Sequence, residues 1–204
     1  YGKNYVLGKM GLRLPSLQTY GSINRGLDKL VATNNYSFIN YDIVTENNFN
    51  YLKLYVTEDE ARHFLKVGLH YDEIFKTGLL LNYSAKRLLF KNSNLSLDVV
   101  VGDKPRYYLN YFIDNGYIPG FGIYSSGMSF DLKNVDNYVI DRWEWTRNEV
   151  YIQSIWKDKF AIGGGISHDY FKAENSNGDN RRYSRFLNPY VFIKTDTQDD
   201  KEFA

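Results

Sequence analysis

The sequence RHFLKVGLHYD at positions 62–72 decides the fold, because apolar and polar residues alternate along it. Leu65, Val67 and Leu69 share one parity, and Lys66 has the other. A period of two places successive side chains on opposite faces of an extended chain. The stretch therefore predicts a β-strand with one apolar face and one polar face.

The same alternation continues through the segments that follow, which polar turns separate. These segments are 76–84, 95–102, 106–115, 118–130, 143–156, 160–171 and 186–195. They predict about eight antiparallel strands after Arg62, of about 10 residues or more, as a transmembrane β-barrel requires. In such a barrel the outer face meets lipid, the lumen holds water, and closure pairs every backbone group. Two polar segments, 131–139 and 172–182, are predicted as loops, the second on the cell exterior.

The facing of each strand follows from polarity, because lumenal residues should be the more polar set. The more apolar parity is therefore expected to point outward, into the bilayer. We predict these lipid-facing residues: Leu65, Val67, Leu69, Tyr107, Leu109, Tyr111 and Ile113.

The bulk composition excludes some classes of protein. The 204 residues carry a net charge of +1, so nothing indicates a nucleic-acid partner. No run of 18 apolar residues exists, and therefore no transmembrane helix is predicted. The 19 Tyr residues suit a membrane–water interface, although a soluble β-rich fold would also explain them. The sequence starts at Tyr1 rather than Met, which we interpret as a processed or truncated piece.

Residues 1–60 follow a different pattern, which predicts a small α+β unit before a barrel at 61–204. A short helix is expected within 4–14, because Pro15 ends it. Ser16 is the predicted cap of a second helix, whose apolar residues recur every three or four positions. Two strands, at 38–44 and 50–57, flank a turn at 46–48.

Specific phrases in this order resemble known membrane proteins. The phrases YVLGKMGLRLP (5–15), INRGLDKLVATNNY (23–36) and YLKLYVTE (51–58) are similar to the last POTRA domain of Omp85-type proteins, without its first strand. The phrases HFLKVGLHYDEIFKTGLLLN (63–82) and KRLLFKNS (86–93) resemble the opening barrel strands of outer-membrane patatin-like phospholipases.

The resemblance implies a location and two alternative functions. It places the barrel in the bacterial outer membrane, in contact with its lipid, and the POTRA in the periplasm. Because those phospholipases have about sixteen barrel strands, about eight would form the first half. The parent would then hydrolyse lipid acyl esters with a Ser–Asp dyad located before Tyr1. The alternative function is an Omp85-type assembly or translocation factor without catalysis. A closed eight-stranded barrel is the alternative to half of a larger barrel.

The resemblance also implies partners. The POTRA strand pair has an edge to which a strand of a periplasmic partner could add. Complexes with other outer-membrane proteins are a further expectation.

We predict no catalytic residue in this chain. Gly165–Asp169 reads GISHD, which approaches the G-x-S-x-G nucleophile elbow, but Asp169 replaces the last glycine. The phrase also lies inside a strand pattern. No cofactor or metal is predicted either, because His63 and His70 have opposite parity on one strand. The acidic cluster of Asp196, Asp199 and Asp200 is interpreted as a solvated turn rather than a calcium site.

Two surface features keep alternative interpretations. The basic clusters Lys86–Arg87 with Lys91, and Arg181–Arg182 with Arg185, could meet lipid head groups or form solvated turns. The three tryptophans could belong to an aromatic girdle or pack beneath a loop: Trp143, Trp145 and Trp156.

Overall fold

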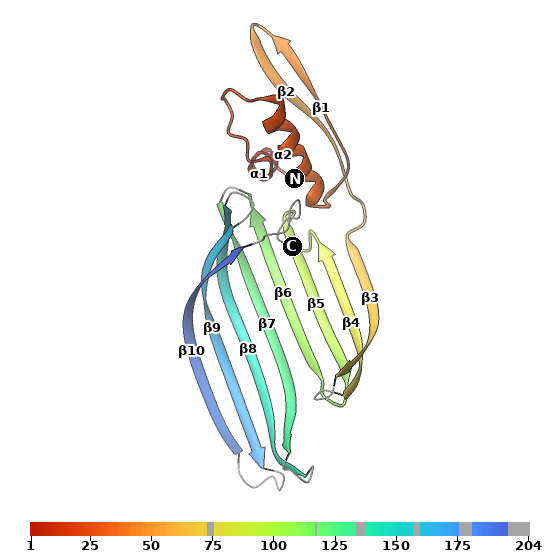
Figure 1. The fold of residues 1–204 in the computed structure, drawn as a ribbon, viewed down its shortest axis with the longest axis vertical. Coiled ribbons are helices and arrows are strands. Elements are labelled where there is room, and N and C mark those ends of the chain that lie inside the picture. Colours follow the sequence, from red (N-terminus) through yellow and green to blue (C-terminus); the bar gives the residue numbers. More distant parts are fainter. Residues whose placement is uncertain (73–75, 117, 134–137, 157–159, 176–180, 196–204) are drawn as a thin grey trace.

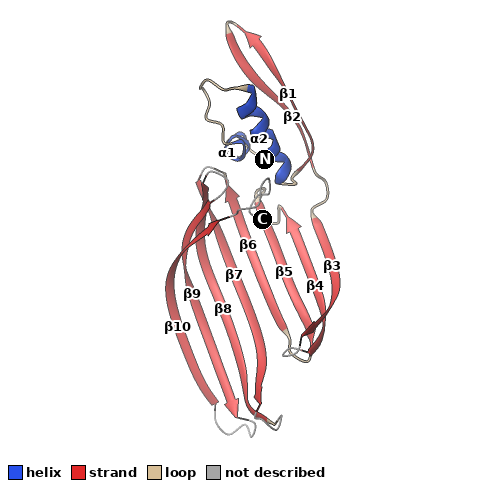
Figure 2. Cartoon of the chain, in the orientation of Figure 1, coloured by secondary structure: helices blue, strands red, loops and turns tan. Residues whose placement is uncertain are grey.

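The computed structural model describes residues 1–72, 76–116, 118–133, 138–156, 160–175 and 181–195. A unit of two helices and a hairpin lies at one end of a large curved sheet (Figure 1). Figure 2 shows that both helices belong to the first unit. The elements are α1 (Lys3–Met10), α2 (Tyr20–Ala32), β1 (Tyr36–Glu46), β2 (Phe49–Glu58), β3 (His63–Asp72), β4 (Lys76–Lys86), β5 (Ser93–Gly102), β6 (Arg106–Asn115), β7 (Ile118–Lys133), β8 (Val139–Trp156), β9 (Phe160–Asn175) and β10 (Arg181–Thr195).

The N-terminal unit, residues 1–60, has its own small core. Met10, Leu12 and Leu30 are its buried residues, and Ile39 and Leu54 of the hairpin pack against them. Burial of these apolar side chains holds both helices on one face of the hairpin. Among the described residues, neither helix is long and apolar enough to cross a membrane.

The second helix starts later than predicted. Its cap is Thr19, whose hydroxyl accepts from the Ser22 backbone N–H, and the Ser22 hydroxyl accepts from the Thr19 N–H in return. This reciprocal capping box satisfies two free donors at once, whereas the Ser16 hydroxyl donates to the Arg13 carbonyl. Leu17, the residue directly after the predicted cap, therefore lies outside the helix and is fully exposed.

The hairpin agrees with the prediction. The antiparallel strands β1 and β2 pair from Glu46↔Phe49 to Tyr36↔Glu58. Asn47 and Asn48 connect them with φ values of 51° and 64°, the left-handed pair that a two-residue hairpin turn requires.

Strands β3 to β10 form one antiparallel sheet in the order of the sequence. The predicted antiparallel strands and their approximate number are therefore confirmed. Strands β3 and β10 are the two ends of the sheet and do not pair with each other within the described residues. The sheet is open, so a closed eight-stranded barrel is wrong for this part of the chain.

The strands β7 to β10 run further than predicted, into both segments that we interpreted as loops. Asp131 in β7 pairs with Arg142 in β8, and Glu174 in β9 pairs with Arg181 in β10. These neighbours also form ion pairs, at 3.3 Å and 3.2 Å. Opposite charges placed across a ladder stabilise a sheet, so a polar segment can continue a strand.

Candidate functional site at the mouth of the sheet

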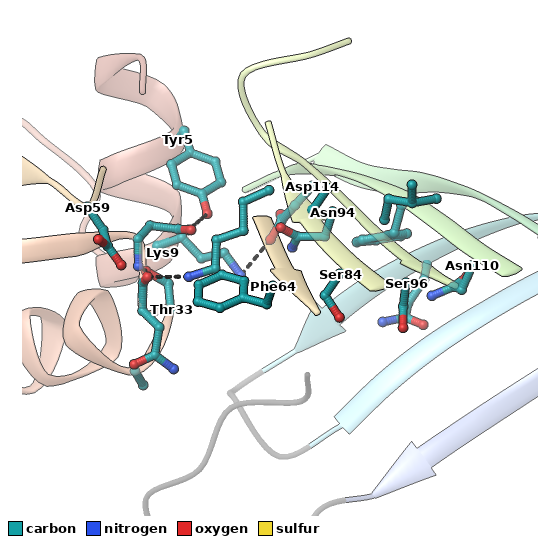
Figure 3. A pocket seen from close by; sticks show the side chains of 18 of the residues that line it. Tyr5, Lys9, Thr33, Asp59, Phe64, Ser84, Asn94, Ser96, Asn110 and Asp114 are labelled. Atoms are coloured by element: carbon teal, nitrogen blue, oxygen red, sulfur yellow. Dashed lines mark hydrogen bonds and ion pairs between the residues drawn. The ribbon is translucent and has the colours of Figure 1, made fainter. Parts of the chain in front are cut away.

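The sheet has two chemically different faces. We define the inner face as the one that lines a cavity of about 800 Å³ beside the N-terminal unit, and the outer face as its opposite (Figure 3). The strand residues of the inner face that line this cavity are Phe64, Ser84, Asn94, Ser96, Asn110, Phe112, Tyr151, Gln153 and Lys194. We refer to the space as the mouth cavity.

Short polar side chains form one wall of the mouth cavity. Ser84, Ser96 and Asn110 are direct neighbours across β4, β5 and β6. Their hydroxyl and amide groups can donate and accept hydrogen bonds without carrying charge. This wall is suited to hold water or a neutral polar segment.

Aromatic rings form another wall, and a glycine makes room for it. Tyr151 reaches from β8 across β7, and its hydroxyl donates to Asn110 Oδ1 at 2.8 Å. Its ring lies over Gly122 of β7, where any Cβ would overlap the ring. Phe112 stacks beside Tyr151 with ring centroids 6.0 Å apart. The glycine in β7 therefore has a packing role, which its small size alone allows.

The N-terminal unit closes the cavity from the other side. Lys9 of α1 pairs with Asp114 of β6 at 2.6 Å, and both side chains are mostly buried. Lys86 Nζ donates to the backbone carbonyl of Asn34 at 2.5 Å. Figure 3 shows Lys9 and Thr33 facing Phe64 and Asp114 across this boundary.

Arg87 contacts several groups of the N-terminal unit. It follows β4 in a tight turn with φ of 60°, and its side chain is only 8% exposed. Its guanidinium donates to Glu58 Oε2 at 2.6 Å and to the carbonyls of Asn35 and Asp59 at 3.3 Å. The guanidinium also lies 4.9 Å from the ring centre of Tyr1. The Tyr1 amine and Arg87 hold the pKa of Glu58 below its usual range.

These contacts correct the interpretation of the first basic cluster. Lys86 and Arg87 contact the N-terminal unit rather than lipid head groups or solvent. The sequence contains only one signal for this contact: two basic residues next to a predicted turn.

A second polar network lies on the inner face, further from the N-terminal unit. Asp169 is 3% exposed and accepts from Arg147 Nε at 2.7 Å, Trp145 Nε1 at 3.1 Å and Asn188 Nδ2 at 3.0 Å. The aspartate that ends the elbow-like phrase is thus fully engaged in a structural ion pair. Ser167 is buried within β9, where no helix follows it, so the phrase does not form an elbow.

The strand pairing places all seven predicted lipid-facing residues on the outer face. Leu65 pairs with Tyr83, Tyr83 with Leu97, and Leu97 with Leu109, so one row crosses four strands. Leu69 of this face is 86% exposed. Contact with lipid stays a prediction, and the apolar exposure is the property on which it rests.

The girdle interpretation is wrong for two of the tryptophans. Trp143 and Trp145 lie on the inner face, where they stack with Phe130 and Phe171 at 6.3 Å and 6.1 Å. The side chain of Trp156 lies outside the described residues.

The described residues contain no group of three or more His, Asp or Glu side chains that could hold a metal. Residues 196–200 and the side chain of His70 are not among them. The polar groups that line the mouth cavity can bind and position a polypeptide segment through hydrogen bonds.

The chain is similar to known proteins in its sequence family and in its fold. A family described as the OMP85 superfamily matches residues 50–204. A crystal structure of BamA from Haemophilus ducreyi lacking POTRA domains 1–3 is similar, with 11% sequence identity and a TM-score of 0.64. The similarity covers 92% of this chain and 40% of that BamA chain, and at this identity it shows the fold alone. No curated protein matches the sequence.

Proposed function

Since this chain belongs to the OMP85 superfamily, we propose that it forms one side of a β-barrel in a bacterial outer membrane. The observation that carries the proposal is the contrast between the two faces of the sheet. Apolar side chains cover the outer face of β3 to β6, and serines, asparagines and ion pairs occupy the inner face. A membrane barrel requires this distribution, because lipid meets one face and water the other.

The strands that complete the barrel belong to the same proposal. Open edges in hydrocarbon would leave backbone groups without partners, so the free edges of β3 and β10 must pair with further strands. About eight more strands would give the sixteen that the resemblance implies.

We assign the N-terminal unit to the periplasm as a POTRA-like domain. Its two helices on one face of a hairpin and its resemblance to the last POTRA support this assignment. The outer edges of β1 and β2 are unpaired among the described residues, and they offer a place where a partner strand could add.

For the parent protein, a role in assembly or translocation of other proteins is favoured by the mouth cavity. A neutral polar cavity at the junction of a periplasmic unit and a barrel suits the entry of an extended polypeptide, whose peptide groups need hydrogen-bond partners. The barrel would then act without catalysis.

The second proposal is an anchor for a patatin-like hydrolase, supported by the resemblance at 63–82 and 86–93. Peptide sequencing and the intact mass of the native protein separate the two. A G-x-S-x-G peptide upstream of Tyr1 favours the hydrolase anchor and contradicts the role in assembly or translocation. Repeated POTRA-like peptides without that serine support assembly or translocation.

A further inference from the structure

The outer face of β7 to β10 changes from apolar to charged along its length. Near the N-terminal unit it carries exposed aliphatic and aromatic residues: Phe121, Ile123, Val150, Ile152, Ile162, Val191 and Ile193. Toward the opposite end, outer-face positions of the same strands carry Asp131, Arg142, Glu144, Lys172, Glu174 and Arg181. In the proposed membrane barrel, the point at which the residues change corresponds to the boundary between hydrocarbon and the polar head-group layer.

The carboxylates beyond this boundary already have cationic partners. Asp131 contacts Arg142 as well as Lys104. Glu144 accepts from Lys172 at 3.0 Å, and Glu174 contacts Arg181 at 3.2 Å. These pairs neutralise the acidic groups of this face.

Arg185 lies at the boundary itself and differs from these cations. It is exposed on β10, two residues from Leu187 on the apolar side and two from Tyr183 on the polar side. The pairing of β10 with β9 sets it opposite Tyr170, and its guanidinium lies 5.6 Å from the centre of that ring. Tyr170 in turn stacks with Tyr183 at 6.2 Å. Within the described part of the chain, no carboxylate lies within ion-pair distance of Arg185.

We propose that Arg185, on its platform of Tyr170 and Tyr183, binds the phosphate of an anionic lipid head group. Tyrosine rings favour the membrane interface, and an arginine stem can lie along apolar surface while its head reaches the phosphate layer. The planar guanidinium matches a phosphate with two parallel hydrogen bonds. The inference rests on the proposed insertion into a membrane, because only then does the boundary meet lipid phosphates.

The test uses native mass spectrometry of the full-length protein in detergent, titrated with phosphatidylglycerol or neutral phosphatidylcholine. We expect the wild type to retain phosphatidylglycerol preferentially. Arg185→Gln should weaken its retention about fivefold, which corresponds to the ~1 kcal/mol typical of one basic residue at an anionic surface. Arg185→Met, which keeps the stem and removes the charge, should weaken it equally.

Arg182→Gln is the matched control, because Arg182 is also exposed on the same strand but pairs with Asp141 on the inner face. Unchanged retention in Arg185→Gln and Arg185→Met would overturn the proposal, as would equal losses in Arg182→Gln. Displacement of the lipid by millimolar inorganic phosphate would also contradict a lipid site.

Insertion of each variant into neutral phosphatidylcholine vesicles is measured separately. Failure of the wild type to insert contradicts the proposed barrel, whereas normal insertion with unchanged lipid retention contradicts only this site.

Discussion

Replacing Arg87 by Met should loosen the N-terminal unit from the sheet while both parts stay folded. The charged hydrogen bond to Glu58 at 2.6 Å is worth about 1.5–3 kcal/mol, and the contact with the Tyr1 ring adds ~0.5–1 kcal/mol. The Glu58 side chain is 40% exposed, so water can solvate it once Arg87 is removed. We therefore expect a loss of about 2–3 kcal/mol in the free energy that holds the two parts together.

Hydrogen–deuterium exchange of the Asp59 amide reports this loss, because that amide donates to the carbonyl of Asn35 at 2.9 Å beside Arg87. Its exchange should accelerate about 30- to 150-fold, since 1.4 kcal/mol corresponds to a factor of ten. Arg142→Met is the control, because Arg142 is a 64% exposed cation far from the junction. Exchange of Asp59 that accelerates less than about threefold, or equally in the control, would refute the role assigned to Arg87.

Three further outcomes follow from the contacts. Gly122→Val should destabilise the sheet by about 1–3 kcal/mol in urea unfolding, because the added side chain overlaps the Tyr151 ring. The control Gly68→Val should cost less, because a Cβ at Gly68 comes no nearer to Leu80 than 4.0 Å, and equal costs would contradict the packing role of Gly122. Asp169→Asn should cost about 1.5–3 kcal/mol in the same assay, because it removes the close carboxylate of Arg147 and leaves only Glu149, at 3.7 Å. A stability equal to the wild type would show that the network is dispensable. Because the pKa of Glu58 is lowered in the folded protein, its contribution to docking is complete above pH ~4.3, the pKa of an unfolded glutamate, and is lost as the pH falls through the lower folded pKa. The faster exchange of the Asp59 amide at low pH should therefore be absent in Glu58→Gln, and its persistence would assign the pH dependence to another group.

The alternation of apolar and polar residues was sufficient to predict the strands and their order. It worked because the outer and inner faces differ in chemistry, so the period of two is visible from Leu65 to Ile113. The strand ends beyond Asp131 and Phe171 were missed, because charged residues there resemble a loop until their cross-strand partners are known. Polarity alone does not tell a ladder of ion pairs from a solvated turn.

The junction could be predicted only in part. The helices, the hairpin and its Asn47–Asn48 turn follow from local sequence signals. The contact of Arg87 with Glu58 joins residues 29 positions apart, and no local pattern reports such a pair. The mouth cavity needs side chains from both units and from several strands, and therefore it becomes visible only in the folded structure.

The most direct test of the membrane barrel is the folding of Val67→Arg into phosphatidylcholine vesicles, compared with Ser96→Arg. Val67 lies on the outer face and is 63% exposed, whereas Ser96 lines the mouth cavity on the inner face. We expect Val67→Arg to lose about 2–4 kcal/mol of folding free energy if it lies near the bilayer midplane, and Ser96→Arg to lose little. Normal folding of Val67→Arg, or a larger loss in Ser96→Arg, would contradict the proposal that the outer face meets lipid.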